Sequence, residues 1–161
     1  MRTRASLLVV LATALIAGCG FHLRGDVRLS ARMSEPWVEA SDRYTPFYDE
    51  LTTTLGSAGA TLAAGRDAAT AVIHVHEDDT GRNVLTISAR NTPQEYEVFY
   101  TVEYSVSAGG QEILPRQKLT LTRVYAYDDT AVLAKQHEES DIRQALAREL
   151  AGLVAVRLAA L

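Results

Sequence analysis

The chain has one cysteine and no apolar run long enough to cross a bilayer. Among its 161 residues only Cys19 carries a thiol, so no disulfide can form within the chain and no second thiol can complete a metal or redox motif. The longest apolar run, Ala5 to Ala17, has 13 residues, whereas a membrane-spanning helix needs roughly 20. Glycine-rich phosphate loops, Gly-x-Ser-x-Gly motifs and internal repeats are also missing. The sequence therefore argues against a mature transmembrane helix and against the common nucleotide-binding and serine-hydrolase sites.

The N-terminus has the layout of a secretory signal peptide. Arg2 and Arg4 precede the short apolar run, and small residues follow it. Ile16-Ala17-Gly18-Cys19 resembles the lipobox of bacterial lipoproteins, in which the cysteine thiol receives a diacylglycerol before the leader is cut. We expect cleavage before Cys19 and removal of residues 1–18. The alternative is a leader that happens to end in cysteine, with an ordinary cleavage site nearby.

Acylation at Cys19 would make the mature protein a membrane-anchored lipoprotein. One acyl chain holds a protein only marginally, whereas two or three hold it stably. In lipoproteins of this kind, aspartate after the cysteine is the common signal for retention at the inner membrane, and here Gly20 occupies that position. We therefore expect an outer-membrane location, with the protein facing the periplasm.

The mature chain is acidic on average. The leader removes two of the 16 basic residues, which leaves 14 against 20 acids and changes the formal charge from −4 to −6. Nucleic acid is an improbable class of partner on that balance. A local basic patch could still bind a polyanion.

Periodicity predicts a single α+β domain over residues 33–161, joined to the anchor by an extended connector over residues 19–32. A first strand is expected at Trp37–Ala40. A helix should follow, because Thr45 suits an N-cap and Pro46 suits the first helical position. Apolar residues then repeat every four positions, at Phe47, Leu51 and Leu55. Gly56 or Gly59 is expected to end this helix.

The middle of the chain alternates as strands do. Ile73 and Val75 begin a pattern that Leu85 and Ile87 resume with the same parity. Tyr96 to Val106 keeps a period of two for eleven residues, which predicts a strand with one buried side. The buried side would hold Tyr96, Val98, Tyr100, Val102, Tyr104 and Val106. Gly109-Gly110 predicts a hairpin turn, and the next strand should run from about Arg116 to Tyr127.

A long final helix is expected from about Thr130, with Asp129 as its cap. Its apolar stripe comprises Ile142, Leu146, Leu150, Leu153, Val154 and Leu161. Glu139 and Arg143 stand four apart and are predicted on a solvated face. The whole pattern indicates two helices packed on one face of a four-stranded sheet, a two-layer sandwich.

No set of residues predicts an active site, a metal or a cofactor. His74 and His76 share one strand face and could ligate zinc, but no third ligand is sensibly spaced, so two half-exposed histidines are the favoured interpretation. Three adjacent carboxylate pairs are interpreted as a loop, a helix start and a solvated helix face: Asp78-Asp79, Asp128-Asp129 and Glu138-Glu139. The tyrosines of the central strand could stack a ligand, but their valine neighbours favour core.

Basic residues are few, and six of them fall in the strand region and at the start of the last helix. They are Arg82, Arg90, Arg116, Lys118, Arg123 and Lys135. Guanidinium groups pair well with phosphates, so several together could hold an anionic lipid headgroup. The alternative is scattered solubilising charge.

Several segments resemble one known family. Cys19-Gly-Phe-His-Leu-Arg-Gly25 directly after a lipobox is similar to the start of the LPS-assembly lipoproteins, the LptE family. Similar too are Glu95-Tyr96 with its alternating strand, Arg123-Val-Tyr-Ala-Tyr-Asp128, and the run from Val132 to the terminal helix. Some relatives carry a polar tail after the last helix, and this chain ends at Leu161.

The resemblance implies two helices against a four-stranded sheet, and a non-enzymatic role. It also implies a partner, the LptD-type outer-membrane β-barrel, in which the lipoprotein sits largely as a plug, helps the barrel to fold and binds lipopolysaccharide (LPS). On this basis Arg90, before the central strand, and Lys135, at the start of the last helix, are expected to contact LPS phosphates. The alternatives are a periplasmic lipid-binding accessory of an inner-membrane transporter and a lipid-anchored hydrolase.

Overall fold

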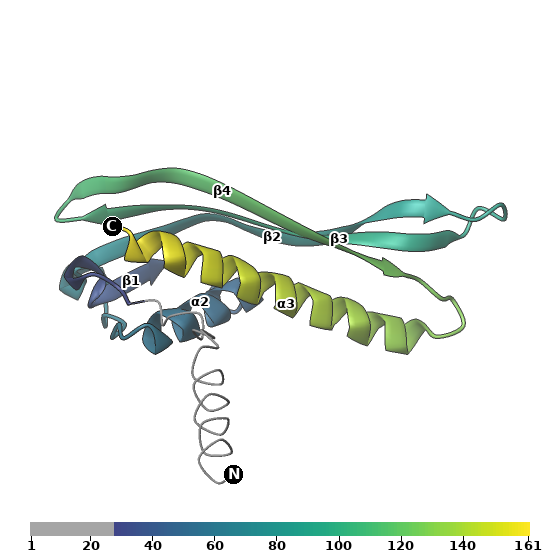
Figure 1. The fold of residues 1–161 in the computed structure, drawn as a ribbon, viewed down its shortest axis with the longest axis horizontal. Helices are drawn as coiled ribbons and strands as arrows, with labels where there is room; N and C mark the ends of the chain where they lie inside the picture. Colours follow the sequence, from purple (N-terminus) through teal and green to yellow (C-terminus); the bar gives the residue numbers. More distant parts are fainter. Residues whose placement is uncertain (1–27) are drawn as a thin grey trace, which may run out of the picture.

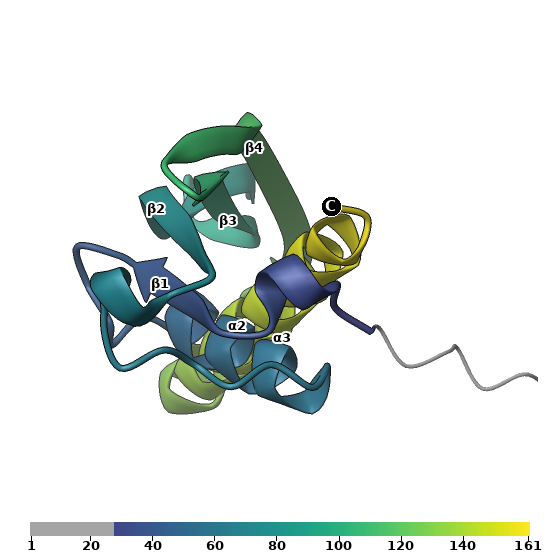
Figure 2. The same cartoon turned by 90° about the vertical axis from the view of Figure 1, so that its left-hand side faces the viewer.

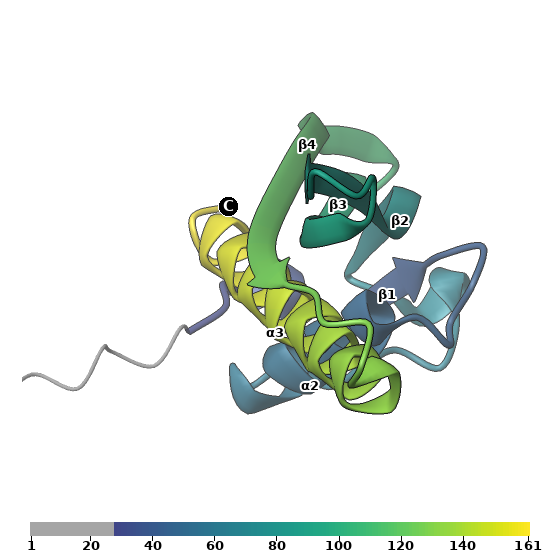
Figure 3. The same ribbon diagram turned by 90° about the vertical axis from the view of Figure 1, so that its right-hand side faces the viewer.

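The computed structural model describes residues 28–161, in which two helices lie on one side of a four-stranded sheet (Figure 1). The strands follow the order β1 (Pro36–Glu39), β2 (Ala71–Ile87), β3 (Pro93–Ala108) and β4 (Gln111–Ala126). The helices are α2 (Pro46–Ser57) and α3 (Val132–Ala159), with short 3-10 turns η1 (Ala31–Met33) and η2 (Arg66–Ala68). End views show both helices beneath a curled sheet (Figures 2 and 3). The predicted α+β two-layer sandwich is confirmed.

The fold begins slightly before the expected boundary. Leu29 packs against the core, and η1 buries Met33 completely. The extended connector was expected to reach Arg32, but residues 31 and 32 form part of η1 because burial of Met33 fixes that turn. The leader, Cys19 and the connector up to residue 27 lie outside the described residues.

Helix α2 follows its sequence signals closely. The Thr45 side chain accepts a hydrogen bond from the Tyr48 amide at 3.1 Å, and Pro46 is the first helical residue. The helix ends at Ser57, and Gly59 follows with a φ of +91°. The Ala60 amide donates to the Leu55 carbonyl at 3.1 Å, as in a Schellman motif. This helix connects β1 to β2, which run parallel, whereas the other strand pairs are antiparallel.

Strand β3 confirms the predicted alternation. Five of its inward residues are buried: Val98, Tyr100, Val102, Tyr104 and Val106. Tyr96 packs partly against the same core. The Gly109-Gly110 turn is also confirmed, because both glycines have the positive φ that such a turn requires, +57° and +79°. Strand β4 begins earlier than predicted, at Gln111, since the tight turn lets pairing start at once.

The predicted loop at Asp78-Asp79 is wrong, because β2 runs straight through it, paired to β3. The register of that pairing shifts by one residue between Val75 and Glu77. Such a bulge reverses which side chains face the helices. Two further shifts follow, between Val84 and Thr86 and between Thr86 and Ile87. At this end of β2 neither parity is buried: Val84, Leu85 and Ile87 are 51%, 51% and 59% exposed, so the predicted burial of Leu85 and Ile87 is wrong.

Helix α3 packs its apolar face on the sheet and on α2. Its fully buried residues include Leu146, Leu150, Val154 and Leu158, with small alanines between them. The predicted stripe is wrong at Leu153, which lies at the edge of the buried face and is 42% exposed. Asp129 does not cap the helix: the N-cap position is Ala131, which makes no side-chain cap bond.

Candidate functional site

We define the hairpin end as the β2–β3 turn together with the neighbouring ends of β4 and α3, at the right of Figure 1. The turn is closed by the Ser88 amide, which donates to the Thr92 carbonyl at 2.8 Å. Asn91 adopts a φ of 60°, and the Arg90 amide donates to the Ser88 hydroxyl at 3.2 Å. The Arg90 side chain is exposed, and no described carboxylate pairs with it. The structure thus presents this predicted site residue at an extremity of the domain.

Lys135 lies at the same end but in a different environment. Its Nζ is 2.8 Å from Glu138 Oε2, and only 20% of its side chain is exposed. It lines a hollow of about 480 Å³ together with Thr92 and Pro93 of the turn region and with Asp128 and Asp129. The structure therefore brings Lys135 beside the base of the turn that carries Arg90, although Lys135 itself is surrounded by acids.

The two acids of this hollow, Asp128 and Asp129, lie in a turn and not at the start of a helix as predicted. The Asp128 carboxylate accepts hydrogen bonds from the hydroxyl and the amide of Thr130, at 2.7 and 2.9 Å. These bonds, the hydroxyl first, lower the pKa of Asp128. Helix α3 begins four residues later, at Val132.

Large apolar side chains are exposed at the hairpin end. Six of the ten exposed large hydrophobic residues in the described part lie there: Val84, Leu85, Ile87, Val124, Val132 and Leu133. Leu133 is 75% exposed. Exposed apolar groups beside a free cation are what an anionic amphiphile would contact.

The outer face of the sheet is polar and carries the other predicted cations in ion pairs. Arg116 lies 3.0 Å from Glu103, and Lys118 lies 2.7 Å from Glu77. Arg123 is instead near Glu149 of α3, at 3.7 Å. The six basic residues therefore do not form one patch.

The two histidines lie on this outer face, stacked with ring centroids 6.2 Å apart. His74 places Nδ1 2.6 Å from Glu39 and Nε2 2.9 Å from Ser107, so both its ring nitrogens have partners. His76 contacts Ser105 at 2.8 Å, and burial is the first cause that lowers its pKa. Within residues 28–161 no three His, Cys, Asp or Glu side chains gather as a metal site.

A buried cluster joins the start of α2 to the sheet. Asp78 accepts hydrogen bonds from Thr45 at 2.5 Å and from the Tyr100 hydroxyl at 2.8 Å. The same hydroxyl accepts from the Phe47 amide at 3.1 Å. Burial is the main reason that the pKa of Asp78 is raised. Since all these partners belong to α2 and the sheet, the contacts serve to hold α2 in place.

Sequence reasoning missed a buried acid. Glu139 was predicted on a solvated face, but it is only 7% exposed and lies between α3 and the sheet. Its carboxylate accepts from Arg82 at 2.5 Å, from the Tyr125 hydroxyl at 2.8 Å and from Arg143. The spacing could have revealed it, because Glu139 precedes Ile142 and Leu146 by three and seven positions and so belongs to their helical face.

Tyrosines surround the Arg82 end of this network. The Arg82 guanidinium lies 4.4 Å above the ring of Tyr96, which stacks on Tyr125 at 5.8 Å. The hydrogen bonds to Tyr125 and Glu139 raise the pKa of Arg82, and burial is the first cause that raises the pKa of Tyr125. Arg82 therefore stays charged and Tyr125 stays protonated at neutral pH.

No helix between residues 28 and 161 is long and apolar enough to cross a membrane. The predicted anchor site, Cys19, precedes this part of the chain.

Comparisons with known proteins agree with the arrangement. A family model described as "Lipopolysaccharide-assembly" (LptE) matches residues 37–158. An LPS-assembly lipoprotein LptE of Pectobacterium atrosepticum is 28% identical over 155 residues, covering 94% of this chain and 83% of the relative. One from Yersinia pestis is 26% identical over 149 residues, covering 91% and 70%.

Solved lipoproteins share the fold. A minor lipoprotein from Acinetobacter baumannii is 22% identical with a TM-score of 0.66 and coverage of 80% and 92%. Lipoprotein B from Nitrosomonas europaea is 21% identical with a TM-score of 0.72 and coverage of 88% and 91%. Since the family model spans most of the chain, this protein belongs to the LptE family of outer-membrane lipoproteins, which act in LPS assembly and are not enzymes.

Proposed function

We propose that this lipoprotein plugs and helps assemble an LptD-type β-barrel in the outer membrane, and that it binds LPS during insertion at the cell surface. Residues 1–18 are its leader, and acyl chains on Cys19 tether it to the membrane. The residues after Cys19 then link the anchor to the domain, whose core already includes Leu29, and the domain faces the periplasm and the barrel lumen.

The polar outer face of the sheet supports the plug. Barrel interiors are polar, whereas the outward band that faces lipid is apolar and about 25 Å tall. The outer face carries cross-strand ion pairs such as Glu103–Arg116, and the Thr101 and Thr120 hydroxyls lie 2.9 Å apart on it. The 17 residues of β2, at about 3.3 Å each, span about 55 Å and so exceed the height of that band.

The hairpin end supports LPS binding, and it is the single observation that carries this proposal. LPS combines phosphates with acyl chains. Arg90 offers a guanidinium without an ion pair in the described residues, and Leu133 and Ile87 are among the exposed apolar groups of the same end. Lys135 is the weaker candidate of the two, because Glu138 already pairs with it.

Charge reversal at the hairpin end tests LPS binding. The double variant Arg90→Glu, Lys135→Glu should bind LPS about tenfold or more weakly than the unaltered mature protein at low salt, since a hydrogen bond to a charged group contributes about 1.5–3 kcal/mol. The matched control is Arg116→Glu, Lys118→Glu, which makes the same charge change on the outer face. Equal LPS affinity in the two double variants would reject Arg90 and Lys135 as contacts.

Affinity purification from detergent-extracted outer membranes tests the partner. An integral β-barrel should co-purify with the protein and be identified by mass spectrometry. Recovery of inner-membrane transporter subunits in its place would favour an accessory of such a transporter.

The role of the anchor can be separated from that of the plug. A Cys19→Ala form exported by an ordinary signal peptide should still assemble with the barrel, though less well, because the domain would supply most of the contact. Complete loss of the complex with correctly exported, folded protein would contradict the plug.

A further inference from the structure

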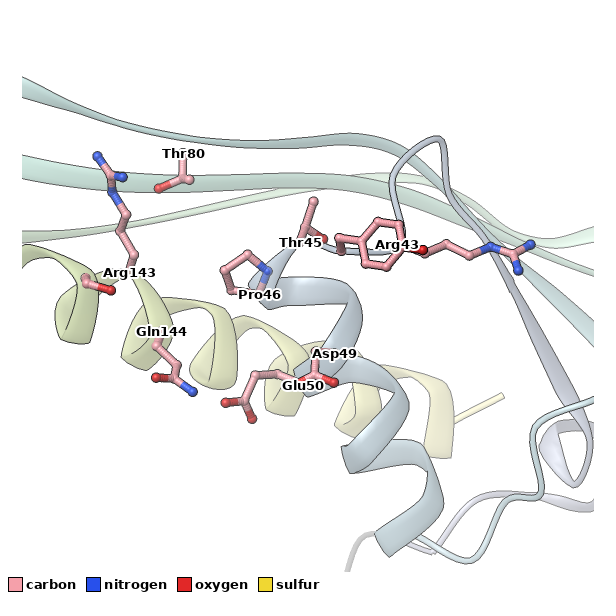
Figure 4. Close-up of a pocket in the computed structure, with 10 residues that line it drawn as sticks. Arg43, Thr45, Pro46, Asp49, Glu50, Thr80, Arg143 and Gln144 are labelled. Carbon is pink, nitrogen blue, oxygen red and sulfur yellow. The ribbon is translucent and has the colours of Figure 1, made fainter.

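A hollow of about 340 Å³ lies between the first half of α3 and β2. It is lined by Arg82, Gln136, Glu139, Ser140 and Arg143, all of them polar or charged. It adjoins a larger hollow of about 590 Å³ at the start of α2, with which it shares Ser140 and Arg143. Figure 4 shows the Arg143 side chain rising from α3 toward Thr80 of β2. The hollow is separate from the hairpin-end hollow around Lys135, which has none of these lining residues.

The charges of this hollow do not balance. Two guanidinium groups, from Arg82 and Arg143, face one carboxylate, that of Glu139. No other described carboxylate lines it or forms an ion pair with either arginine. One net positive charge therefore remains in a recess whose walls are partly shielded from water, where electrostatic attraction exceeds that on an open surface.

The hollow also has more hydrogen-bond donors than its one carboxylate can pair with. The Glu139 oxygens accept three hydrogen bonds, two from guanidinium groups and one from Tyr125. Each guanidinium has five N–H donors, so most remain available. The side chains of Arg82 and Arg143 are 41% and 36% exposed, so their terminal nitrogens are the donors within reach of a ligand, whereas Arg143 Nε is buried without a hydrogen-bond partner. Gln136 and Ser140 add an amide and a hydroxyl at the rim.

A purely structural ion cluster would need only one arginine. Arg82 and Tyr125 together already satisfy Glu139, and replacing a buried ion pair by apolar groups often costs nothing. Arg143 is a third donor to that carboxylate and brings a second positive charge against one negative charge. The planar fork of a guanidinium matches the oxygens of a phosphate, and two forks from different elements can grip one group from two sides.

From this geometry we infer that the hollow binds a phosphate or phosphate-ester group between Arg82 and Arg143, with Ser140 and Gln136 as further donors. The inference needs neither the barrel nor the hairpin-end contacts. The phosphate could belong to a free ion or to a lipid headgroup, and the chemistry of recognition is the same.

Titration of the mature protein with inorganic phosphate tests the site, with the arginine Nε–Hε signals of Arg82 and Arg143 as the readout in nitrogen-15 NMR spectra. Phosphate should shift these signals. Arg143→Gln should weaken binding about tenfold, the scale of a lost charged hydrogen bond. Arg116→Gln, the matched control on the outer face, should leave the affinity unchanged. Binding of free phosphate with the same affinity in the two variants would overturn the inference.

Glu139→Gln distinguishes a binding site from a structural cluster. Removing this carboxylate raises the net charge of the hollow from one to two and frees donors, so phosphate affinity should increase. An ion cluster without a binding role would lose stability and gain no affinity. Should this variant fail to fold, Arg143→Lys keeps the charge but loses the fork, and it should bind more weakly than the unaltered protein.

Parallel binding experiments with three ligands identify the source of the phosphate group. Vesicles of phosphatidylglycerol and of phosphatidylcholine are compared with free phosphate, each with and without Arg143→Gln. A response to free phosphate that Arg143→Gln weakens supports a free-ion site, and a response only to phosphatidylglycerol vesicles supports a headgroup site. No Arg143-dependent response in any arm refutes the inference. The Arg90→Glu, Lys135→Glu variant should keep the phosphate response, so failure of LPS binding at the hairpin end is distinguishable.

Discussion

Replacing Tyr100 by phenylalanine should destabilise the domain more than the loss of one hydroxyl usually does. The Tyr100 hydroxyl donates to Asp78 at 2.8 Å and accepts from the Phe47 amide at 3.1 Å, in the buried first turn of α2. Burial and the neighbouring Asp78 raise the pKa of Tyr100, so the hydroxyl keeps its proton at neutral pH. A buried amide without a partner costs about 1–3 kcal/mol, and a lost bond to a carboxylate adds to that. We expect a loss of about 2–4 kcal/mol for Tyr100→Phe.

A double-mutant cycle with Asp78→Asn separates the two bonds. The free energy of the bond from the Tyr100 hydroxyl to the Asp78 carboxylate should appear as a coupling energy of about 1–2 kcal/mol between these two residues. The part due to the Phe47 amide should persist in the Asp78→Asn background, because that amide still loses its acceptor. Thr45 remains in all four proteins, so its own bond to residue 78 does not enter the comparison between Tyr and Phe.

Urea unfolding at pH 7 measures these losses, with fluorescence of Trp37, the only tryptophan of the chain, as the probe. The midpoint should fall while the dependence of free energy on urea stays constant. Tyr104→Phe is the control: Tyr104 lies four residues along the same strand and is 2% exposed, and no described group hydrogen-bonds its hydroxyl. A loss for Tyr100→Phe within about 0.5 kcal/mol of the control would refute the reasoning.

Three further outcomes are expected. Leu150→Ala should cost about 2–5 kcal/mol in urea unfolding because Leu150 is 0% exposed, whereas Leu153→Ala, at 42% exposed, should cost less than about 1 kcal/mol. Burial raises the pKa of Asp78 above 3.8, so the folded state binds this proton more tightly than the unfolded state does. The resulting stabilisation is fully present below pH 3.8 and is lost as the pH rises through the raised pKa, and Asp78→Asn should remove this part of the pH dependence. Asn91→Gly should leave the melting temperature nearly unchanged, whereas Asn91→Val should lower it, since a φ of 60° costs a branched residue about 1–2 kcal/mol.

Much of this protein follows from local sequence alone. The cap at Thr45 and Pro46, the glycine turn after β3 and the alternation from Tyr96 to Val106 each depend on residues close together in the chain, and the fold has all three. The single cysteine, placed directly after a short apolar run, identifies Cys19 as the expected anchor site, and the residues that follow it indicate the family. Cleavage and acylation at Cys19 stay predictions.

Only the tertiary structure decided where the buried charges lie. The register shift after Val75 reverses the facing of β2, so that Asp78 and Arg82 point toward the helices. No local rule predicts such a shift, because it depends on how β2 pairs with β3. Glu139 is buried for a related reason: α3 packs where Arg82 and Tyr125 can satisfy its carboxylate, and these partners come from strands far away in the chain. Sequence spacing predicts a helical face, but the packing of distant elements determines what that face meets.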